Sequence, residues 1–333
     1  MARTIGVDLG TANTYIYRKN RGIVVREPSV IAIDTEKSRV TALGEDAYEL
    51  LGKALPPIKT YRPVRDGVIA EFDITTALLR GFFEKASGKG SLNRPNVILG
   101  VSHGITEVER RALEEAATEA GARSVAIIEA TMAAALGAGL PINEPRGSMI
   151  VNIGGGTTDV AVMSLGGIVE ADSVRVGGDE LDEAILSYLK RKYNLIISDT
   201  SAEEIKKEFA FMGVFGEDEK IPTRTVDGRD SVSGMPLSIE LAKNELKEPL
   251  EEQISHIIDC IKGVLEKLTP ELSADIHDYG ITVSGGVALL EGLDDYLSSK
   301  LGLEIKIADN PLDCCIEGMG KVIEISPDLV SFN

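Results

Sequence analysis

The amino-acid sequence predicts an α/β protein of two similar halves, and three observations support this prediction. The chain has 333 residues, more than the ~250–300 residues at which a single hydrophobic core stops growing. Strand-like and helix-like patterns alternate along much of its length, as they do in α/β folds. An apolar strand followed by a glycine- and threonine-rich turn occurs twice, so that Asp8 and Asn152 stand 144 positions apart in equivalent places. Such an internal repeat predicts that both halves share one plan.

The first half opens with short β-branched or aromatic runs that are separated by glycine, asparagine or proline, a pattern typical of a β-meander. These runs are residues 4–9, 15–18, 22–26 and 29–34. Later segments alternate between the two periodicities, with strands expected at residues 96–101 and 125–128 and a helix of small residues at about 132–140. The first half therefore reads as a meander followed by alternating β and α elements.

The firmest helical pattern of the first half begins at Thr106. Thr106 and Glu109 have the spacing of a capping box, in which each side chain bonds the backbone N–H of the other residue. The residues of one stripe recur at helical spacing and are expected to be buried: Val108, Ala112, Leu113, Ala116, Ala117 and Ala120. We expect this helix to end near Gly121, because glycine commonly terminates helices.

The second half repeats this order of elements. Strands are predicted at residues 148–153, 159–164 and 168–176, followed by a helix whose apolar face carries Leu181, Ala184, Ile185, Tyr188 and Leu189. Residues 221–225 are expected to form one arm of a hairpin, and a long amphipathic helix is expected at about 238–268. The remaining pattern predicts a strand at 280–284, a helix around 290–300, a strand at 304–308 and a helix from about 312.

The composition excludes some partners. The chain has 35 Lys+Arg against 53 Asp+Glu, a formal net charge of −18 at pH 7, whereas nucleic-acid binders need clustered cations. Three cysteines, two of them adjacent, do not make a disulfide framework and indicate a reducing, cytoplasmic environment. We expect neither a signal peptide nor a transmembrane segment, because neither pattern is found.

Each glycine- and threonine-rich turn has the composition of a phosphate-binding loop. Glycine lets backbone N–H groups approach an anion without interference from a Cβ atom, and threonine hydroxyls add donors. Asp8 ends a predicted buried strand, and a buried carboxylate requires a cation or hydrogen-bond donors. A Mg²⁺ ion that keeps much of its water shell would suit it. Either turn alone is also consistent with a simple tight β-turn, but two facing turns would clamp one polyphosphate.

Five segments resemble the MreB/Mbl family of bacterial actins, and the similarity runs from about residue 4 to residue 321. The segments are residues 8–14, 62–70, 104–111, 154–158 and 176–179. This resemblance implies an actin-like (ribonuclease H-like) two-lobed ATPase fold with duplicated βββαβα core domains. It implies a first lobe of residues 1–145 with 312–333, including subdomain IB at about 33–65, and a second lobe of residues 146–311, including subdomain IIB at about 180–240.

The resemblance further implies ATP or ADP with Mg²⁺ in the cleft between the lobes. The phosphates would meet Thr11, Ala12 and Asn13 from one lobe and Gly155, Gly156 and Thr157 from the other, with Gly178 beside them. The nucleoside would lie near Glu203, Lys206 and Lys207, on a helix capped by Thr200, and opposite Gly285, Gly286 and Ala288. Asp8 would organise the water shell of the metal.

Two departures from the family pattern bear on hydrolysis. Asn152 stands where the family usually has a second carboxylate for the Mg²⁺ waters, and Ala130 stands where it has the glutamate thought to position the attacking water. A methyl group neither accepts a proton nor orients water, and loss of a positioned base costs roughly 10²–10⁴ in rate. Glu129 and Thr158 remain as candidate catalytic residues. The hypothesis is a nucleotide-binding protein that hydrolyses slowly or not at all.

The family resemblance also implies partners. It implies filaments of the protein itself at the inner face of the cell membrane, with MreB paralogues and membrane-bound cell-wall elongation proteins as further contacts. The loop at residues 88–95, where Lys89 and Arg94 flank Leu92, matches a membrane-contacting loop of the family. Two alternatives stay open: a regulator that co-assembles with active paralogues, and a small-molecule kinase of the same superfamily.

Overall fold

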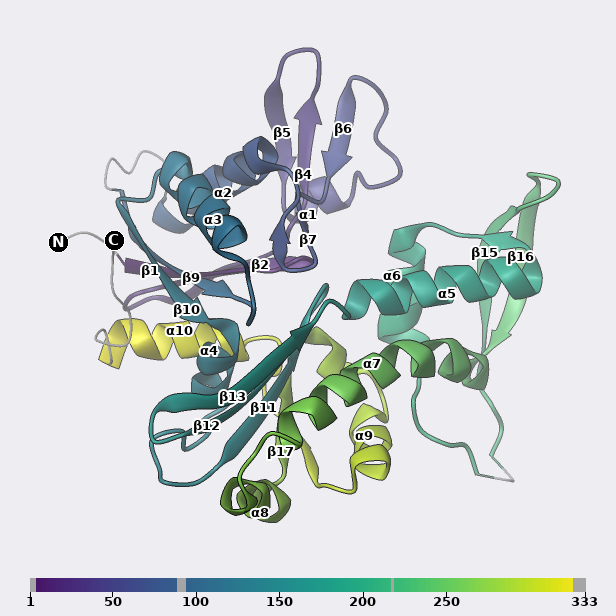
Figure 1. Cartoon of the computed structure of the whole chain (residues 1–333). Coiled ribbons are helices and arrows are strands. Elements are labelled where there is room, and N and C mark those ends of the chain that lie inside the picture. Colours follow the sequence, from purple (N-terminus) through teal and green to yellow (C-terminus); the bar gives the residue numbers. More distant parts are fainter. Residues whose placement is uncertain (1–3, 89–93, 217–218, 326–333) are drawn as a thin grey trace.

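The first of two central sheets is formed by the N-terminal half of the chain. The computed structural model describes residues 4–88, 94–216 and 219–325. The strands of this sheet are β1 (Thr4–Leu9), β2 (Asn13–Arg18), β3 (Gly22–Pro28), β9 (Asn96–Val101) and β10 (Ser124–Glu129). They lie in the order β10-β9-β1-β2-β3 (Figure 1). The first three strands form an antiparallel meander, and β9 and β10 extend it in parallel on the other side of β1.

The second sheet repeats this arrangement. Its strands are β11 (Ser148–Ile153), β12 (Thr158–Ser164), β13 (Gly167–Val174), β17 (Ile281–Ser284) and β18 (Ile305–Ile307). Their order is β13-β12-β11-β17-β18, with an antiparallel meander on one side of β11 and parallel strands on the other. The shared plan that the glycine-rich turns predicted is therefore confirmed.

Helices cover both faces of the first sheet. On one face, Val97 and Leu99 of β9 belong to a buried cluster with Leu78 and Phe82 of helix α2 (Phe72–Ser87), beside α3 (Glu107–Ala120). On the other face, Ile98 packs with residues of α4 (Ala130–Gly137) and α10 (Cys314–Ile325). This alternation follows from the strand, because successive side chains point to opposite faces.

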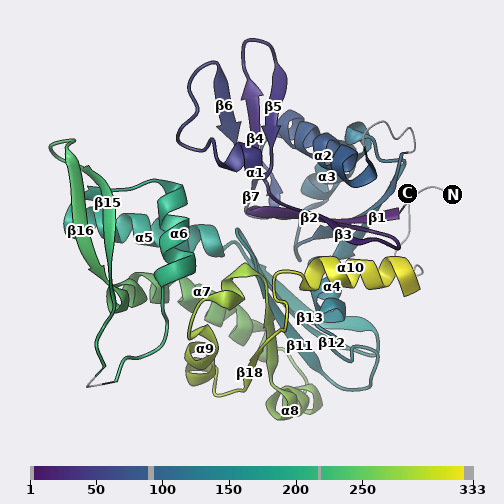
Figure 2. The ribbon, with the colours of Figure 1, turned by 180° about the vertical axis from the view of Figure 1, so that it is seen from behind.

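Helices α4 and α10 pack against each other between the two sheets (Figure 2). Glycine makes this close crossing possible at two places. A Cβ atom at Gly137 would lie 1.8 Å from the carbonyl oxygen of Cys314, and one at Gly318 would lie 1.7 Å from the carbonyl oxygen of Ala133. Any larger residue at either position would force the helices apart.

The largest of the described hydrophobic clusters lies between the second sheet and the helices that pack against it. The helices of this half are α5 (Gly178–Tyr193), α7 (Lys247–Leu265), α8 (Pro270–Tyr279) and α9 (Leu293–Leu301), with short 3₁₀ turns η1 (Lys243–Leu246) and η2 (Gly286–Leu289). The apolar face predicted for α5 is confirmed, since Leu181, Ile185 and Leu189 are fully buried.

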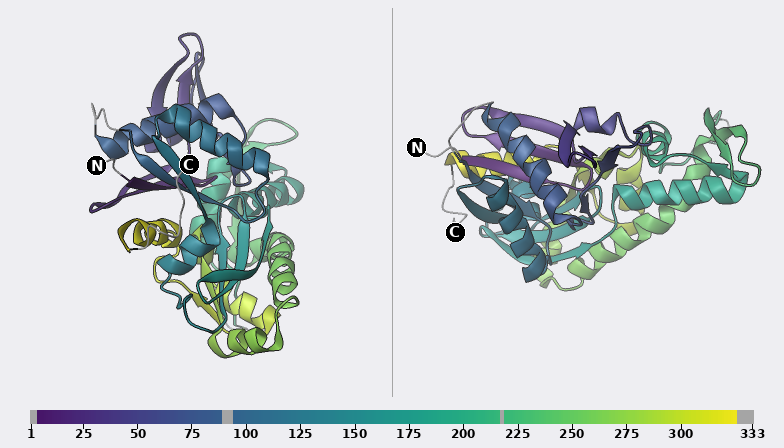
Figure 3. Two further views of the ribbon diagram at one scale, coloured as in Figure 1. Left: turned by 60° about the vertical axis from the view of Figure 1, so that its left-hand side comes forward. Right: turned by 90° about the horizontal axis from the view of Figure 1, so that it is seen from above.

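A smaller unit extends from each half. In the first half it contains β4 (Ile31–Asp34), β5 (Arg39–Leu43), β6 (Ile58–Tyr61) and helix α1 (Glu45–Tyr48), followed by the two-stranded pair β7 (Val64–Arg65) and β8 (Val68–Ile69). In the second half it contains β14 (Leu195–Ile196), β15 (Thr223–Asp230), β16 (Pro236–Ala242) and α6 (Asp199–Phe209). Figure 3 shows that the β15–β16 hairpin lies far from both sheets.

Three of these elements are present but differ from the expectation in their bounds or caps. The helix expected from residue 238 begins at Lys247, because Leu237, Ile239 and Leu241 alternate along strand β16 and face inward. The hairpin arm expected at residues 221–225 is β15, which runs from Thr223 to Asp230. The helix that contains Glu203 is capped by Ser198, whose hydroxyl accepts a hydrogen bond from the backbone N–H of Ser201, and not by Thr200.

In helix α3 the capping box of Thr106 and Glu109 and the terminal Gly121 are confirmed. Val108, in the first turn of the helix, does not join the buried stripe and is 79% exposed. Within the described ranges, no helix combines the length and the apolar character needed to cross a membrane.

Candidate functional site

A cavity of about 560 Å³ lies between the two halves and is lined by residues of both. Most residues that the family resemblance implied are brought together there: Asp8, Thr11, Ala12, Asn13, Asn152, Gly155, Gly156, Thr157, Gly178, Glu203, Lys206, Lys207, Gly285 and Gly286. Among the described residues that line the cavity, Glu129, Thr158 and Ala288 are not found, whereas Ala130 and Val287 are.

The two glycine-rich turns meet tip to tip at this cavity. Each turn is closed by a short backbone hydrogen bond, from Gly10 to Asn13 at 3.0 Å and from Gly154 to Thr157 at 2.8 Å. A Cβ atom at Gly155 would lie 3.0 Å from the Cβ atom of Ala12. Gly155 and Gly156 are therefore required by the approach of the opposite turn. Their backbone N–H groups, unlike those of Gly10 and Gly154, are available to an anion held between the halves.

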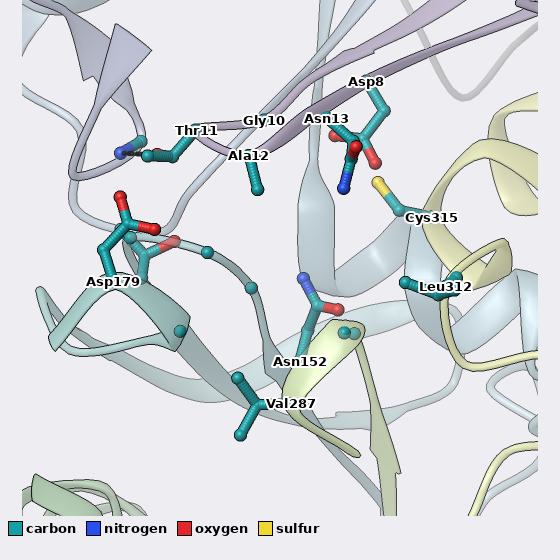
Figure 4. Close-up of a pocket in the computed structure, with 18 of the residues that line it drawn as sticks. Asp8, Gly10, Thr11, Ala12, Asn13, Asn152, Asp179, Val287, Leu312 and Cys315 are labelled. Carbon is teal, nitrogen blue, oxygen red and sulfur yellow. Dashed lines mark hydrogen bonds between the residues drawn. The ribbon is translucent and has the colours of Figure 1, made fainter. Parts of the chain in front are cut away.

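Thr11 is fixed by a further segment of the first half. Its hydroxyl oxygen accepts a hydrogen bond from the backbone N–H of Gly67 at 3.1 Å, as Figure 4 shows. A Cβ atom at Gly156 would lie only 2.7 Å from the same hydroxyl. The hydroxyl proton of Thr11 is thus left to donate into the cavity.

Asp8 is a partly buried carboxylate that faces the cavity beside Cys315 (Figure 4). Burial raises the pKa of Asp8 to about 6; a hydrogen bond from the Cys315 thiol opposes the rise, and the charge of Asp159 adds to it. A cation near Asp8 would offset the cost of its buried charge.

Asn152 occupies the equivalent place in the second half. Its side-chain oxygen accepts a hydrogen bond from the hydroxyl of Ser284 at 3.1 Å. In Figure 4 the amide nitrogen points toward the side of the cavity that holds Asp8 and Asn13. Asn152 therefore presents a hydrogen-bond donor where a carboxylate would present an acceptor.

Asp159, which sequence reasoning missed, supplies a carboxylate next to Asn152. The two residues are direct partners in the β11–β12 ladder, and Asp159 lines the cavity although it is only 1% exposed. The backbone N–H of His103 donates to its Oδ1 atom at 2.9 Å, and burial raises its pKa. Strand alternation was a usable signal, because it places Asp159 and Thr157 on one side of β12 and Thr158 on the other.

Thr158 and Glu129, the candidate catalytic residues, have other partners. The Thr158 hydroxyl donates to the carbonyl oxygen of Val176 at 2.8 Å in the core. Glu129 lies 3.3 Å from the Nδ1 atom of His103, at the protein surface. The hydroxyls of Ser102 and Thr157, which line the same cavity as Ala130, lie 3.1 Å apart and connect the two halves.

Helix α6 forms another wall of the cavity. Lys206 donates to the carbonyl oxygen of Gly178 at 2.6 Å and to Asp182 at 2.8 Å. Burial raises the pKa of Asp182 to about 6 although the charge of Lys206 lowers it. Lys206 thus ties α6 to the start of α5, beside the second glycine-rich turn.

Gly285 and Gly286 form the opposite wall. Gly285 has a φ of +87°, and a Cβ atom on it would lie 2.2 Å from the carbonyl oxygen of Ile153, so this position requires glycine. Further lining residues that sequence reasoning missed are apolar or acidic: Leu289, Leu312, Asp179 and Cys315. Leu289 and Leu312 are partly exposed there and offer an apolar surface to a flat ring.

The donor set fits a water-shelled Mg²⁺ ion better than a dedicated metal cage. Within the described residues no group of three or more His, Cys, Asp or Glu side chains could hold a metal ion by itself. Mg²⁺ characteristically keeps several waters and binds through one or two carboxylates together with substrate phosphates. Asp8 and Asp159, on the two sides of the cavity, are such carboxylates.

A family model described as MreB/Mbl protein matches residues 2–330. The chain belongs to the MreB/Mbl family. The cell shape-determining protein Mbl of Bacillus subtilis is 44% identical over 323 residues, which cover 97% of this chain and 96% of Mbl. The cell shape-determining protein MreB of Escherichia coli K12 is 44% identical over 326 residues, 96% of this chain and 93% of MreB.

A solved structure of an MreB-family protein confirms the actin-like fold. The crystal structure of MreB5 of Spiroplasma citri bound to ADP is similar with a TM-score of 0.90 and 37% identity, over 97% of this chain and 96% of that one. The same protein bound to AMPPNP gives a TM-score of 0.91 over 99% of this chain and 98% of that one, also at 37% identity.

Proposed function

We propose that this MreB/Mbl family member binds ATP or ADP with Mg²⁺ between its halves, assembles with itself into filaments that serve cell-shape control, and hydrolyses ATP slowly or not at all. The single observation that carries the proposal is the meeting of two glycine-rich turns across a cavity that has a carboxylate, Asp8 or Asp159, on each side. MreB5 of Spiroplasma citri, bound to ADP or AMPPNP, supports nucleotide binding by this fold.

Each wall of the cavity has a task in this proposal. The backbone N–H groups of the two turns and the Thr11 hydroxyl bind the phosphates. Asp8 and Asp159 orient the waters of the metal, which when bound neutralises phosphate charge. Leu289 and Leu312 contact the purine, and Glu203 and Lys207 lie at the edge of that surface. The lobes would be residues 1–145 with 312–333 and residues 146–311, with IB and IIB as the smaller units of each.

Slow hydrolysis follows from the atoms at the phosphate end. Ala130 offers only a methyl group to a water there, and the side-chain oxygen of Asn152 is already bonded to Ser284. Glu129 and Thr158, which are directed to His103 and to Val176, do not replace the missing base. The Ser102 and Thr157 hydroxyls would orient a water without accepting its proton.

Phosphate release from Mg-ATP tests the hydrolysis proposal. We expect turnover at least a hundredfold below that of E. coli MreB measured in parallel, because loss of a positioned base costs roughly 10²–10⁴ in rate. Turnover equal to that of E. coli MreB would contradict the proposal, provided that a Thr157→Ala variant abolishes it and thereby excludes a contaminating ATPase.

Sedimentation tests filament formation and the regulator alternative together. A self-assembling protein pellets alone in the presence of ATP or AMPPNP. A regulator, the alternative favoured by Ala130 and Asn152, pellets only when an active MreB paralogue is added. A small-molecule kinase would pellet in neither case.

We also propose a peripheral location at the inner face of the cell membrane. The loop expected to contact the membrane, residues 88–95, lies largely outside the described residues, so this part of the proposal rests on the family resemblance. Flotation with anionic liposomes tests it. Equal flotation of the unchanged protein and a Leu92→Ser variant would remove this loop from the proposal.

A further inference from the structure

Glu203 of helix α6 is bonded by two residues from the other half of the molecule. The hydroxyl of Tyr48, at the end of α1, donates to its Oε2 atom at 3.1 Å, and the guanidinium of Arg62 donates to the same atom at 3.1 Å. The sequence separations are 155 and 141 residues. These contacts join the two smaller units, which otherwise extend from different sheets.

The burial and charge of this cluster make the contacts strong. Glu203 is only 8% exposed. Burial would raise its pKa, but the hydrogen bonds and charges of Lys207 and Arg62 outweigh burial and lower the pKa to about 2. Burial and the charge of Glu203 raise the pKa of Tyr48 to about 12. At neutral pH an ionised acceptor therefore meets a protonated phenol and a guanidinium, a charge-assisted pairing.

Arg62 and Tyr48 also support each other. The guanidinium carbon of Arg62 lies 5.7 Å from the centre of the Tyr48 ring, within the range of a cation–π contact. Lys207 holds the second carboxylate oxygen of Glu203 at 2.6 Å. The carboxylate is thus fixed from its own helix on one side and from the opposite half on the other.

Two members of the cluster, Glu203 and Tyr48, line the nucleotide cavity or the cavity beside it. Glu203 lines the main cavity and also a neighbouring cavity of about 530 Å³. Tyr48 lines only the neighbouring one, together with Ala12 and Asn13 of the first glycine-rich turn. The bonded trio therefore joins the two halves beside the first glycine-rich turn, where it would hinder the departure of a nucleotide held by that turn.

We propose that Tyr48, Arg62 and Glu203 form a clasp that closes the two halves over the bound nucleotide and limits its release. Tyr48 and Arg62 act as positioning residues, through Glu203, and are not ligands of the phosphates. Opening of the cavity would separate Glu203 from Tyr48 and Arg62, whereas Lys207 would stay bonded to Glu203 because both lie on helix α6. The inference has two parts. Its kinetic part, the slow release of nucleotide, rests on the proposed nucleotide binding; its conformational part, the closure of the two halves, rests on the contacts alone.

Release of a fluorescent ADP analogue, chased with excess ADP in a stopped-flow instrument, tests the kinetic part. We expect Arg62→Ala to raise the release rate about tenfold and Tyr48→Phe, which removes one oxygen, to raise it a few-fold. Arg62→Lys should restore part of the slow release because it keeps the charge. Association rates should change by less than twofold, which separates a clasp from a damaged site.

Lys59→Ala and Tyr61→Phe are the matched controls. Both residues lie on β6, next to Arg62, where Lys59 is exposed and its ammonium nitrogen lies 4.7 Å from the centre of the Tyr61 ring. These variants remove the same charge and the same hydroxyl without touching Glu203. Release rates equal to the controls in both Arg62→Ala and Tyr48→Phe would overturn the proposal.

The conformational part is measured without nucleotide. Spin labels are attached at Lys53→Cys and Asp199→Cys, one on each smaller unit, in a Cys260→Ser background. Arg62→Ala should lengthen and broaden the distance distribution, and an unchanged distribution would overturn the clasp. If the unchanged protein binds no nucleotide at all, the proposed function fails, while this distance still decides whether the clasp exists.

Discussion

Replacing Asp8 by asparagine removes a partly buried charge that lines the cavity. In the metal-free protein this charge is opposed by burial and by Asp159, and a hydrogen bond from the Cys315 thiol stabilises it. The asparagine side chain of the Asp8→Asn variant keeps the shape and an acceptor oxygen for the thiol. We therefore expect the variant to be more stable than the unchanged protein at neutral pH when no metal is present.

The pKa of Asp8 sets both the size and the sign of this effect. Its rise from 3.8 to about 6 corresponds to about 3 kcal/mol at ~1.4 kcal/mol per pKa unit. A carboxyl whose pKa is raised by folding contributes stability below its unfolded value and loses it as the pH rises through its folded value. The advantage of the variant should thus grow between about pH 4 and pH 6 and stay constant above pH 7.

Urea unfolding followed by circular dichroism in EDTA, at half-unit steps from pH 4 to pH 8, measures this advantage. Asp34→Asn is a control of opposite sign, because backbone hydrogen bonds from Lys37 and Glu36 lower the pKa of Asp34. At neutral pH the Asp34→Asn variant should be less stable than the unchanged protein. In acid this difference should shrink, because Asp34 of the unchanged protein becomes protonated. A difference between Asp8→Asn and the unchanged protein that does not vary with pH would refute the reasoning.

Three further substitutions test the cavity and the crossing of helices α4 and α10. Ala130→Glu should raise the rate of phosphate release from Mg-ATP tenfold or more, within the roughly 10²–10⁴ that a positioned base supplies; an unchanged rate would show that this position is not limiting. Gly318→Ala should lower the free energy of unfolding by about 1–3 kcal/mol, because the added Cβ atom would overlap a carbonyl oxygen of α4. Gly263→Ala is its control: this position in helix α7 has open space around it, so the free energy of unfolding should rise by about 0.5–1 kcal/mol. Gly156→Ala should weaken the binding of fluorescent ATP at least tenfold, since the added Cβ atom would lie 2.7 Å from the Thr11 hydroxyl, and unchanged affinity would mean that the turns need not meet.

Local patterns were sufficient to predict the duplicated core. The glycine-rich turns, the strands beside them and the capping box of α3 depend on residues close in sequence, and all are found. Helix α2 was not predicted, because its β-branched Ile74 and Thr75 and its internal Gly81 disfavour a helix. Packing of Leu78 and Phe82 on the first sheet overrides that local preference.

The features of the candidate site that the sequence did not predict depend on contacts between distant segments. The pattern around residue 152 drew attention to a missing carboxylate, yet the strand pairing places Asp159 beside it. The partners of Glu203 come from more than 140 residues away, and no periodicity links them. Cys315 reaches Asp8 only because α10 returns to the first sheet at the end of the chain.

The backbone crosses between the two sheets twice, once through α4 and once just before α10 (Figure 1). At Gly137 and Gly318 the backbones of these two helices lie close together, so a rotation of one half against the other would take place about this crossing. The width of the cavity then depends on the angle between the two halves at this crossing. In the filament proposed above, where one geometry would repeat from subunit to subunit, a small change of that angle would add up along the polymer and alter its curvature and twist.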